Sequence, residues 1–368
     1  MISFEMSDEQ RMIKDMATDF AANEFRPKAH ECDEKDEIPA EVFQKAWELG
    51  MVNSSIPENY GGTGMARSSV SGAIMSEELA YGDLSMAMGV LAPALFLYPV
   101  MEFGTEEQKS KFLPVFTGGN FVKATAAVVE PAFDFDLAAL ATTAQKKGGG
   151  YVLNGKKCFV PLGAGADYLM IYAADEKPGY ENVCGYIVEK GAKGLTVVGR
   201  EHNMGVKALE TAELTLENVE VQAAARLGGE QRCDFAKLMN YSRVALSAMA
   251  VGVARASFDY ARQYAKERVA FGEPIAHRQA IAFMLAEMAI EVDATRCLVW
   301  EAAWRLDKNL DSLRESYLAK LYADQMVMKV CDYGVQILGG HGYIREHPVE
   351  LWFRNARGFA AFEGMATV

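Results

Sequence analysis

The chain has 368 residues, of which 50% are apolar and 24% are charged, as in globular proteins. One hydrophobic core seldom serves a chain of this length, so we expect two or three domains. The net charge is −13, from 37 basic and 50 acidic residues, which argues against a surface for nucleic acid.

The first third of the chain predicts helices. Ser7 and Gln10 form a capping-box pattern ahead of apolar residues spaced four apart. Thr105 and Gln108 repeat this pattern, and Pro39 stands at a further helix start. Together these signals indicate an N-terminal helical domain over residues 1–119.

Residues 85–104 form the longest apolar stretch. Pro93 and Pro99 interrupt it, so it predicts a buried helical segment and no membrane insertion. The first residues lack the basic start and apolar core of a signal peptide, which predicts a cytoplasmic protein.

The middle of the chain predicts strands without intervening helices, and therefore a small antiparallel barrel or sandwich over residues 120–228. The pair Asn154-Gly155 predicts a hairpin turn, and the glycine run at 148–150 predicts another. The expected strands are residues 124–130, 137–145, 151–160, 167–175, 182–190 and 212–221.

From about residue 231 the helical period returns and persists. Residues 280–307 carry apolar side chains at helical spacing, and residues 317–340 form a second long helical stretch that ends at Gly339 and Gly340. These lengths are typical of a helical bundle, here assigned to residues 229–368. The fold class is therefore mainly α with a β domain between two helical regions.

Metal and disulfide chemistry have little support in the sequence. The six cysteines show no C-x-x-C pairing and the five histidines are scattered, so we expect free thiols and no metal site. Glu77 and Glu78 are adjacent and do not share a helix face, which argues against a carboxylate dyad. "LGGHGY" follows a helical pattern, so it predicts a helix end and not a dinucleotide fingerprint.

Over nearly its whole length the chain resembles the acyl-CoA dehydrogenase family. The segments that carry the resemblance stand in the family order: "PENYGGTG", "SEELAYGD", "GTEEQKSKFLP", "YVLNGKKCFV", "ELTLENVEV", "KERVAFGEPI", "RQAIAFMLAEM", "QILGGHGY" and "EHPVELWFRNAR". The resemblance implies a helical domain, a β domain and a four-helix bundle. It also implies FAD as cofactor, a tetramer of like or homologous subunits, and oxidation of an acyl-CoA thioester to the 2-enoyl-CoA. Electrons are then expected to pass to an electron-transfer flavoprotein.

The family's catalytic base commonly stands in a Glu-Gly pair near the C-terminus, which matches Glu363 and Gly364. A minority of members place the base before an arginine in a bundle helix, but here Ser242 precedes Arg243. The resemblance therefore implies Glu363 as base, with Asn240, Arg243 and Gly364 at the substrate. A solvated charge for Glu363 and a helix ion pair for Arg243 are the alternatives.

Two flavin-facing segments depart from the family pattern. Val129 replaces a threonine, and residues 132–135 replace small residues and a serine. Phe159 can still stack on a ring, but Pro161 supplies neither a hydroxyl nor a backbone N–H. Val129 and Phe159 would be the contacts of this chain's β domain with a flavin.

The family segments that reach the FAD of a neighbouring subunit are retained. "RVAFG" supplies Arg268 and Phe271, and "QILGG" supplies Gln336, Gly339 and Gly340. The alternative for Arg268 is a surface ion pair with Glu267 or Glu273.

These departures leave three hypotheses open. The chain is a flavoenzyme subunit with its own base, a half-site subunit that completes a partner's FAD site in a hetero-oligomer, or a member with altered flavin chemistry such as oxygen-dependent oxidation. The acyl group of the substrate is not readable from the sequence.

Overall fold

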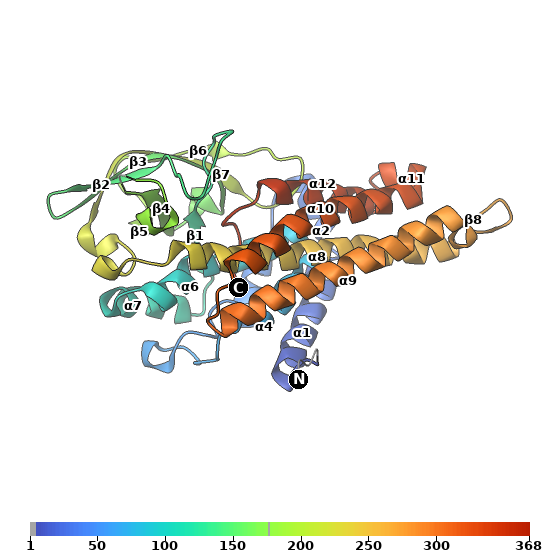
Figure 1. Ribbon diagram of the computed structural model, residues 1–368, viewed down its shortest axis with the longest axis horizontal. Helices are drawn as coiled ribbons and strands as arrows, with labels where there is room; N and C mark the ends of the chain where they lie inside the picture. Colours follow the sequence, from blue (N-terminus) through green and yellow to red (C-terminus); the bar gives the residue numbers. More distant parts are fainter. Residues whose placement is uncertain (1–4, 176) are drawn as a thin grey trace.

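The computed structural model describes residues 5–175 and 177–368. A curled β-sheet lies at one end of the molecule and long helices of the C-terminal third extend from it to the other end (Figure 1). The N-terminal helices pack beneath both. The fold class expected from the sequence, mainly α with a central β domain, is confirmed. The domain limits remain predictions.

The N-terminal helices begin where the capping patterns predict. Ser7 and Gln10 form a complete capping box on α1, and Thr105 and Gln108 form one on α7. The helices of this region are α1 (Asp8–Phe20), the π-helical η1 (Ala21–Phe25), α2 (Ala29–Lys35), α3 (Ala40–Glu48), α4 (Ser69–Gly82), α5 (Leu84–Leu91), α6 (Ala94–Phe103) and α7 (Glu106–Phe112).

The apolar stretch forms α5 and α6, which meet at Pro93. By length and composition alone, Leu84–Phe103 is the one helical stretch in the described part of the chain that could cross a bilayer. It is 94% buried inside the protein, so it is a core element here, as the sequence predicts.

Among the described residues, seven strands form one sheet in the order β1-β4-β2-β3-β7-β6, with β5 paired to β4. Most pairs are antiparallel as expected, but β1 and β2 each pair with β4 in parallel. The strands are β1 (Ala124–Ala127), β2 (Thr143–Lys147), β3 (Gly150–Pro161), β4 (Tyr168–Ala174), β5 (Val183–Glu189), β6 (Leu195–Arg200) and β7 (Thr211–Gln222).

The hairpin predicted at Asn154-Gly155 is wrong, because β3 continues through both residues. Asn154 Oδ1 accepts a hydrogen bond from the backbone N–H of Asn218 at 2.8 Å, and the register with β7 shifts at Gly155. A Cβ on Gly155 would lie 2.4 Å from Thr142 Oγ1, so close packing explains the glycine. The real hairpin joins β2 to β3 at Gly148 and Gly149, as the glycine run predicts.

The C-terminal third is a helical bundle built around α8, which packs against α4, α9 and α10. Its elements are α8 (Phe235–Glu267), the short strands β8 (Val269–Ala270) and β9 (Glu273–Pro274), α9 (Gln279–Asp307), α10 (Leu313–Leu338), α11 (Gly340–Tyr343) and α12 (Val349–Gly358).

Glu77 and Glu78 are buried where α4 meets this bundle. They bind Arg255 and Arg296 at 2.5–3.0 Å and therefore serve as ion-pair partners, not as a dyad.

Candidate functional site

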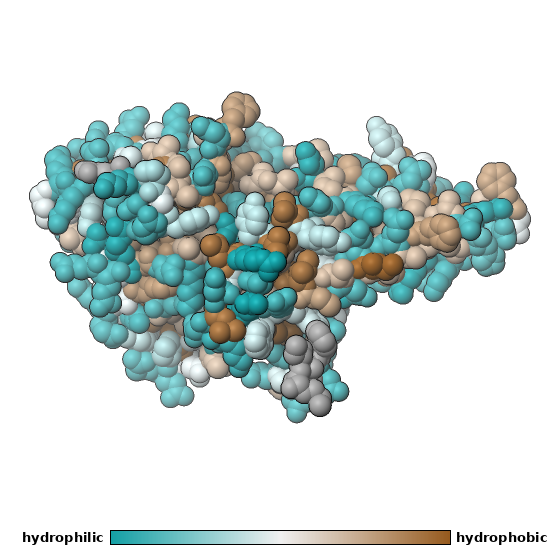
Figure 2. All heavy atoms as spheres, viewed as in Figure 1, coloured by the Kyte–Doolittle hydropathy of each residue, from teal (hydrophilic) through white to brown (hydrophobic). Residues whose placement is uncertain are grey.

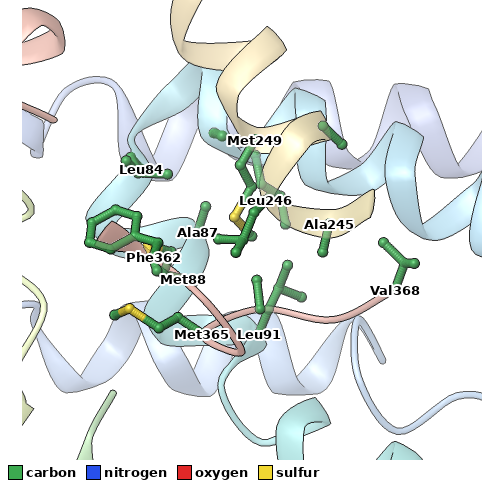
Figure 3. Packing of buried hydrophobic residues seen from close by; sticks show 14 of the residues in the cluster. Leu84, Ala87, Met88, Leu91, Ala245, Leu246, Met249, Phe362, Met365 and Val368 are labelled. Atoms are coloured by element: carbon green, nitrogen blue, oxygen red, sulfur yellow. The ribbon is translucent and has the colours of Figure 1, made fainter. Parts of the chain in front are cut away.

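Glu363 lies on the segment that follows α12 and the 3₁₀ turn Phe359–Ala361. From Phe362 onward this segment runs between α5 and α8, with Phe362 beside Met88 and with Val368 farther along, on the side of Ala245 (Figure 3). Gly364 adopts φ +65°, and a Cβ there would lie 2.4 Å from Val128 Cγ2. The glycine therefore lets the backbone turn sharply beside the residues that follow β1.

The Glu363 carboxylate is partly buried. Its Oε2 is shielded from solvent and has no hydrogen-bond partner among the described residues. Lys320 on α10 donates to the carbonyl of Phe359 at 2.8 Å and to Asp324 at 2.7 Å, which anchors the turn before Glu363. Burial first, and the Glu363 charge as a smaller cause, raise the pKa of Asp324 to about 6.

Arg243 is buried on α8 and does not form the helix ion pair considered from the sequence. Its Nη1 donates to Asn240 Oδ1 and its Nη2 to the Tyr180 hydroxyl, both at 3.2 Å. Asn240 also accepts from Ser316 at 2.8 Å. Arg243 Nε is buried with no partner in the described part of the chain, so one donor remains available.

A narrow cavity of about 10 Å³ separates α6, β1 and α8 from residues 364–367, with Ser242 and Gly364 in its wall. The hydroxyl of Ser242 is buried and, within the described residues, unpaired. The other side chains that line the cavity are apolar except for Tyr172 and Thr367. Glu363 precedes Gly364 in the chain but does not itself line this cavity. Its partly buried carboxylate with an unpaired oxygen is a candidate base for proton abstraction from a weak carbon acid.

A second group of predicted residues lies at the far end of the bundle (Figure 1). Arg268 is exposed and forms no side-chain hydrogen bond or ion pair with any residue that the structure describes. The ion pair considered for Arg268 is absent there: Glu267 accepts from Gln263, and Glu273 pairs with His277 and Arg278. The guanidinium is therefore free to bind an anion.

Phe271 is 95% exposed and sits in the left-handed region at φ +56°. Gln336 is exposed at the end of α10, and a Cβ on Gly339 or Gly340 would meet nothing within 4 Å. These residues, with Arg268, form the bundle face: an open surface with a free cation, an exposed ring and accessible backbone.

The predicted flavin contacts of the β domain behave differently. The backbone N–H of Phe159 donates to both carboxylate oxygens of Glu201, at 3.0 and 3.1 Å. Phe159 has φ +51° at a bulge in β3, and Pro161 lies in the strand without an N–H to offer. The N–H of Phe159, which the sequence placed among the flavin contacts, is thus already used by Glu201.

Val129 is buried, and its carbonyl accepts from Cys158 N–H at 2.9 Å. Next to it, Glu130 accepts from the N–H groups of Ala141 and Thr142 and from Lys157 at 2.9 Å. Burial lowers the pKa of Lys157 to about 8, against the opposing effect of the Glu130 charge. Val129, Phe159 and their neighbours form the β-domain face, on which the Val129 carbonyl, the Glu130 carboxylate and the Phe159 N–H are all bonded within the chain.

Sequence reasoning missed Glu201, Lys157 and Tyr180. Lys157 carries a signal, since it is a charge within the apolar alternation of β3. Glu201 and Tyr180 carry none, because each bonds a residue 42 or more positions away.

Comparison with known proteins identifies the fold. Three family models match in order: the acyl-CoA dehydrogenase N-terminal domain over residues 7–120, the middle domain over 125–219 and the C-terminal domain over 235–368. The chain belongs to the acyl-CoA dehydrogenase family.

Individual members of the family align over nearly the full chain. The probable acyl-CoA dehydrogenase YngJ of Bacillus subtilis is 36% identical, covering 100% of this chain and 97% of that protein. The caffeyl-CoA reductase–Etf complex subunit CarC of Acetobacterium woodii is 34% identical, covering 98% and 96%. The solved butyryl-CoA dehydrogenase of Megasphaera elsdenii superposes with a TM-score of 0.89 at 31% identity, covering 100% and 96%.

Membership makes the chain an acyl-CoA dehydrogenase-type oxidoreductase and indicates FAD as the cofactor. The two faces fit FAD unequally. The bundle face fits, because Arg268 is an unpaired cation and the glycines admit close approach. The β-domain face does not fit a flavin ring in its present conformation, since Glu201 holds the Phe159 N–H.

Proposed function

We propose that this chain is a subunit of an FAD-dependent acyl-CoA dehydrogenase assembly and that its bundle face completes the FAD site of a neighbouring subunit. The observation that carries the proposal is the exposed, unpaired Arg268 beside Phe271 and the open backbone of Gly339. Arg268 would donate to a pyrophosphate oxygen of FAD, and Phe271 would cover an adenine or ribose face. FAD bound in this way supplies the hydride acceptor for oxidation of an acyl-CoA to its 2-enoyl form.

The assembly is expected to be a tetramer of like or homologous subunits. Large apolar side chains are exposed along α9 and α10, and apolar spheres gather over these helices in Figure 2. An exposed apolar surface of this kind is typical of a subunit interface. Its most exposed members are Phe283, Ile290, Trp304, Tyr317 and Leu321.

For the chain's own acyl-CoA site, we assign Glu363 the role of base. Its unpaired Oε2 would remove the α-proton of the thioester, while the buried Arg243 and Asn240 hold the substrate end of α8 in place. The cavity beside Gly364 is only about 10 Å³, so an acyl group has to displace residues 365–367 to enter. An electron-transfer flavoprotein is the proposed acceptor, by analogy with the Etf complex that contains CarC.

The Glu363 assignment is tested by Glu363→Gln in the assembled protein, with the exposed Glu346→Gln as a matched control. Loss of the base is expected to lower acyl-CoA turnover by about 10²–10⁴-fold with flavin content unchanged, because only the proton transfer is removed. If Glu363→Gln turns over the acyl-CoA as fast as Glu346→Gln does, Glu363 is not the base.

The β-domain face favours a second candidate, in which this chain is a half-site subunit without a flavin of its own. A carboxylate on the Phe159 N–H and the absence of an N–H at Pro161 both disfavour a flavin ring there. Expression of the chain alone and with a homologous subunit separates the candidates. Flavin absorbance only in the mixed complex, at roughly one FAD per two chains, supports the half-site. Full occupancy in the lone chain contradicts it.

A further inference from the structure

Two thiols face one another where the sheet meets the bundle. Cys184 is fully buried on β5, and Cys233 is half-buried one residue before Asp234, the N-cap of α8. Their sulfur atoms lie 3.7 Å apart. Cys184 also donates to the carbonyl of Leu227 at 3.5 Å, which leaves the Cys233 thiol to donate to the Cys184 sulfur.

The backbone on both sides is already close. The N–H of Leu227 donates to the carbonyl of Gly185 at 2.9 Å, which holds the linker after β7 against β5. The Cys184 thiol itself reaches the carbonyl of Leu227 at 3.5 Å, so β5 and this linker are in contact on both sides of Cys184. These contacts hold the two segments together, and the remaining distance between the sulfur atoms is 3.7 Å.

Arg232 places unused positive charge beside this pair. Its Nη1 donates to Asp175 at 2.6 Å, but Nε and Nη2 are buried without a partner among residues 5–175 and 177–368. Arg232 also adopts φ +64°, a costly conformation for a side chain that bears a Cβ. The hydrogen bond from Cys233 first, and then the Arg232 charge, lower the pKa of the Cys184 thiol.

We propose that Cys184 and Cys233 are an oxidant-responsive pair that closes to a reversible intrachain disulfide. A peroxide is the oxidant class. The Cys184 thiolate attacks one peroxide oxygen to give a sulfenic acid and releases the other oxygen as hydroxide, which takes up a proton. The Cys233 sulfur then attacks the Cys184 sulfur and displaces the sulfenic oxygen as water, with the Cys233 proton. Two thiols and one hydrogen peroxide thus yield one disulfide and two waters. The sulfur atoms approach from 3.7 Å to about 2.0 Å in this step.

The disulfide would fasten β5 to the start of α8, the helix that carries Asn240 and Arg243. Tyr180 lies at this same contact between the sheet and the start of α8. Its hydroxyl accepts a hydrogen bond from Arg243, and its ring lies 5.9 Å from that of Phe235. Oxidation would therefore restrain the relative movement of the sheet and the substrate-side turns of α8. The inference does not depend on the proposed role of Glu363.

The test uses the full chain as purified, treated with hydrogen peroxide, blocked with iodoacetamide and digested without reduction. Trypsin releases Cys233 in residues 233–237 and Cys184 in residues 158–190, which also contain Cys158. A second cleavage with chymotrypsin, which cuts after Tyr180, separates Cys184 from Cys158. A linked peptide two hydrogen atoms lighter than its reduced parts, and cleaved by dithiothreitol, is the expected result.

The exposed Cys297 reports whether the oxidant reached the protein, and Cys297→Ser is the matched control variant, which should still form the linked peptide. Cys184→Ser and Cys233→Ser should each abolish it. The midpoint of thermal unfolding of the parent chain should rise by about 3–5 °C on oxidation, and that of either serine variant should not. The proposal is overturned if peroxide oxidises Cys297 while iodoacetamide still alkylates both Cys184 and Cys233 after denaturation.

Discussion

The bundle face and the β-domain face differ in how their polar groups are used. The side chain of Arg268 on the bundle face has no partner among the described residues, the surface at Gly339 is sterically open, and the aromatic ring of Phe271 lies in solvent. On the β-domain face, the Phe159 N–H and the Glu130 carboxylate are bonded within the chain. The first surface gains hydrogen bonds when a dinucleotide binds, while the second has to break its own first.

A shared family therefore does not make the two halves of a cofactor site equivalent. Whether each half can bind the cofactor depends on whether its donors are free. In this chain the donor of the bundle face is free and that of the β-domain face is not.

The largest effect is expected from the buried ion pair beneath the β-domain face. Lys157→Met leaves Glu130 buried without its cation and should lower the free energy of unfolding by about 3–5 kcal/mol. The matched control is Lys147→Met, whose partner Glu220 is exposed, and it should change stability by less than about 0.5 kcal/mol. Urea unfolding of the three proteins measures this. Equal stability of both variants would mean that the β-domain face is not held by this pair.

Arg268→Ala tests the bundle face. Loss of a charge-assisted contact to a pyrophosphate should weaken FAD retention in the assembled oligomer by about tenfold or more, since 1.4 kcal/mol is one decade. Arg262→Ala removes an exposed arginine from the last turns of α8, just before Arg268, that already pairs with Asp259, and it should leave FAD affinity unchanged. Titration of FAD into the apoprotein compares the three. If both variants bind like the parent, the bundle face does not hold the cofactor.

The pH dependence of stability sharpens the description of the Glu363 environment. The pKa of Asp324 is raised from 3.8 to about 6 in the folded state, so the folded chain binds this proton first as the pH falls. The contribution of Asp324 to stability should therefore improve by up to roughly 2 kcal/mol between pH 6 and pH 4. Asp324→Asn should remove this rise. If the free energies of unfolding of the parent and of Asp324→Asn change equally between pH 6 and pH 4, the raised pKa of Asp324 is contradicted.

The smallest effect is expected at Glu201. Glu201→Ala frees the Phe159 N–H and removes a carboxylate from the β-domain face. FAD retention by the lone chain should therefore increase by up to about fivefold, which corresponds to one hydrogen bond of roughly 1 kcal/mol. Glu210→Ala is the control, because Glu210 accepts from Ala164 N–H at 2.9 Å farther along the chain. If FAD retention increases in both variants, or in neither, Glu201 does not control flavin binding.

Signals confined to neighbouring residues predicted the fold well. The capping boxes at Ser7 and Thr105 and the end of α10 at Gly339 follow from three or four residues each. The hairpin turn predicted at Asn154-Gly155 was wrong, because that glycine is required by a tertiary contact with Thr142 and not by a turn. The bond between Glu201 and Phe159 could not be predicted, since it depends on how β3 and the loop after β6 meet in space.

The placement of Arg268 and Phe271 has a thermodynamic consequence. They stand on the β8–β9 tip at one end of the molecule, while the segment that carries Glu363 lies near its middle (Figure 1). If this tip serves a neighbour's FAD, cofactor binding and subunit association are linked equilibria, and each strengthens the other by the same free energy. Dilution should then release flavin and dissociate the oligomer over the same range of protein concentration, and added FAD should shift both transitions to lower concentration together.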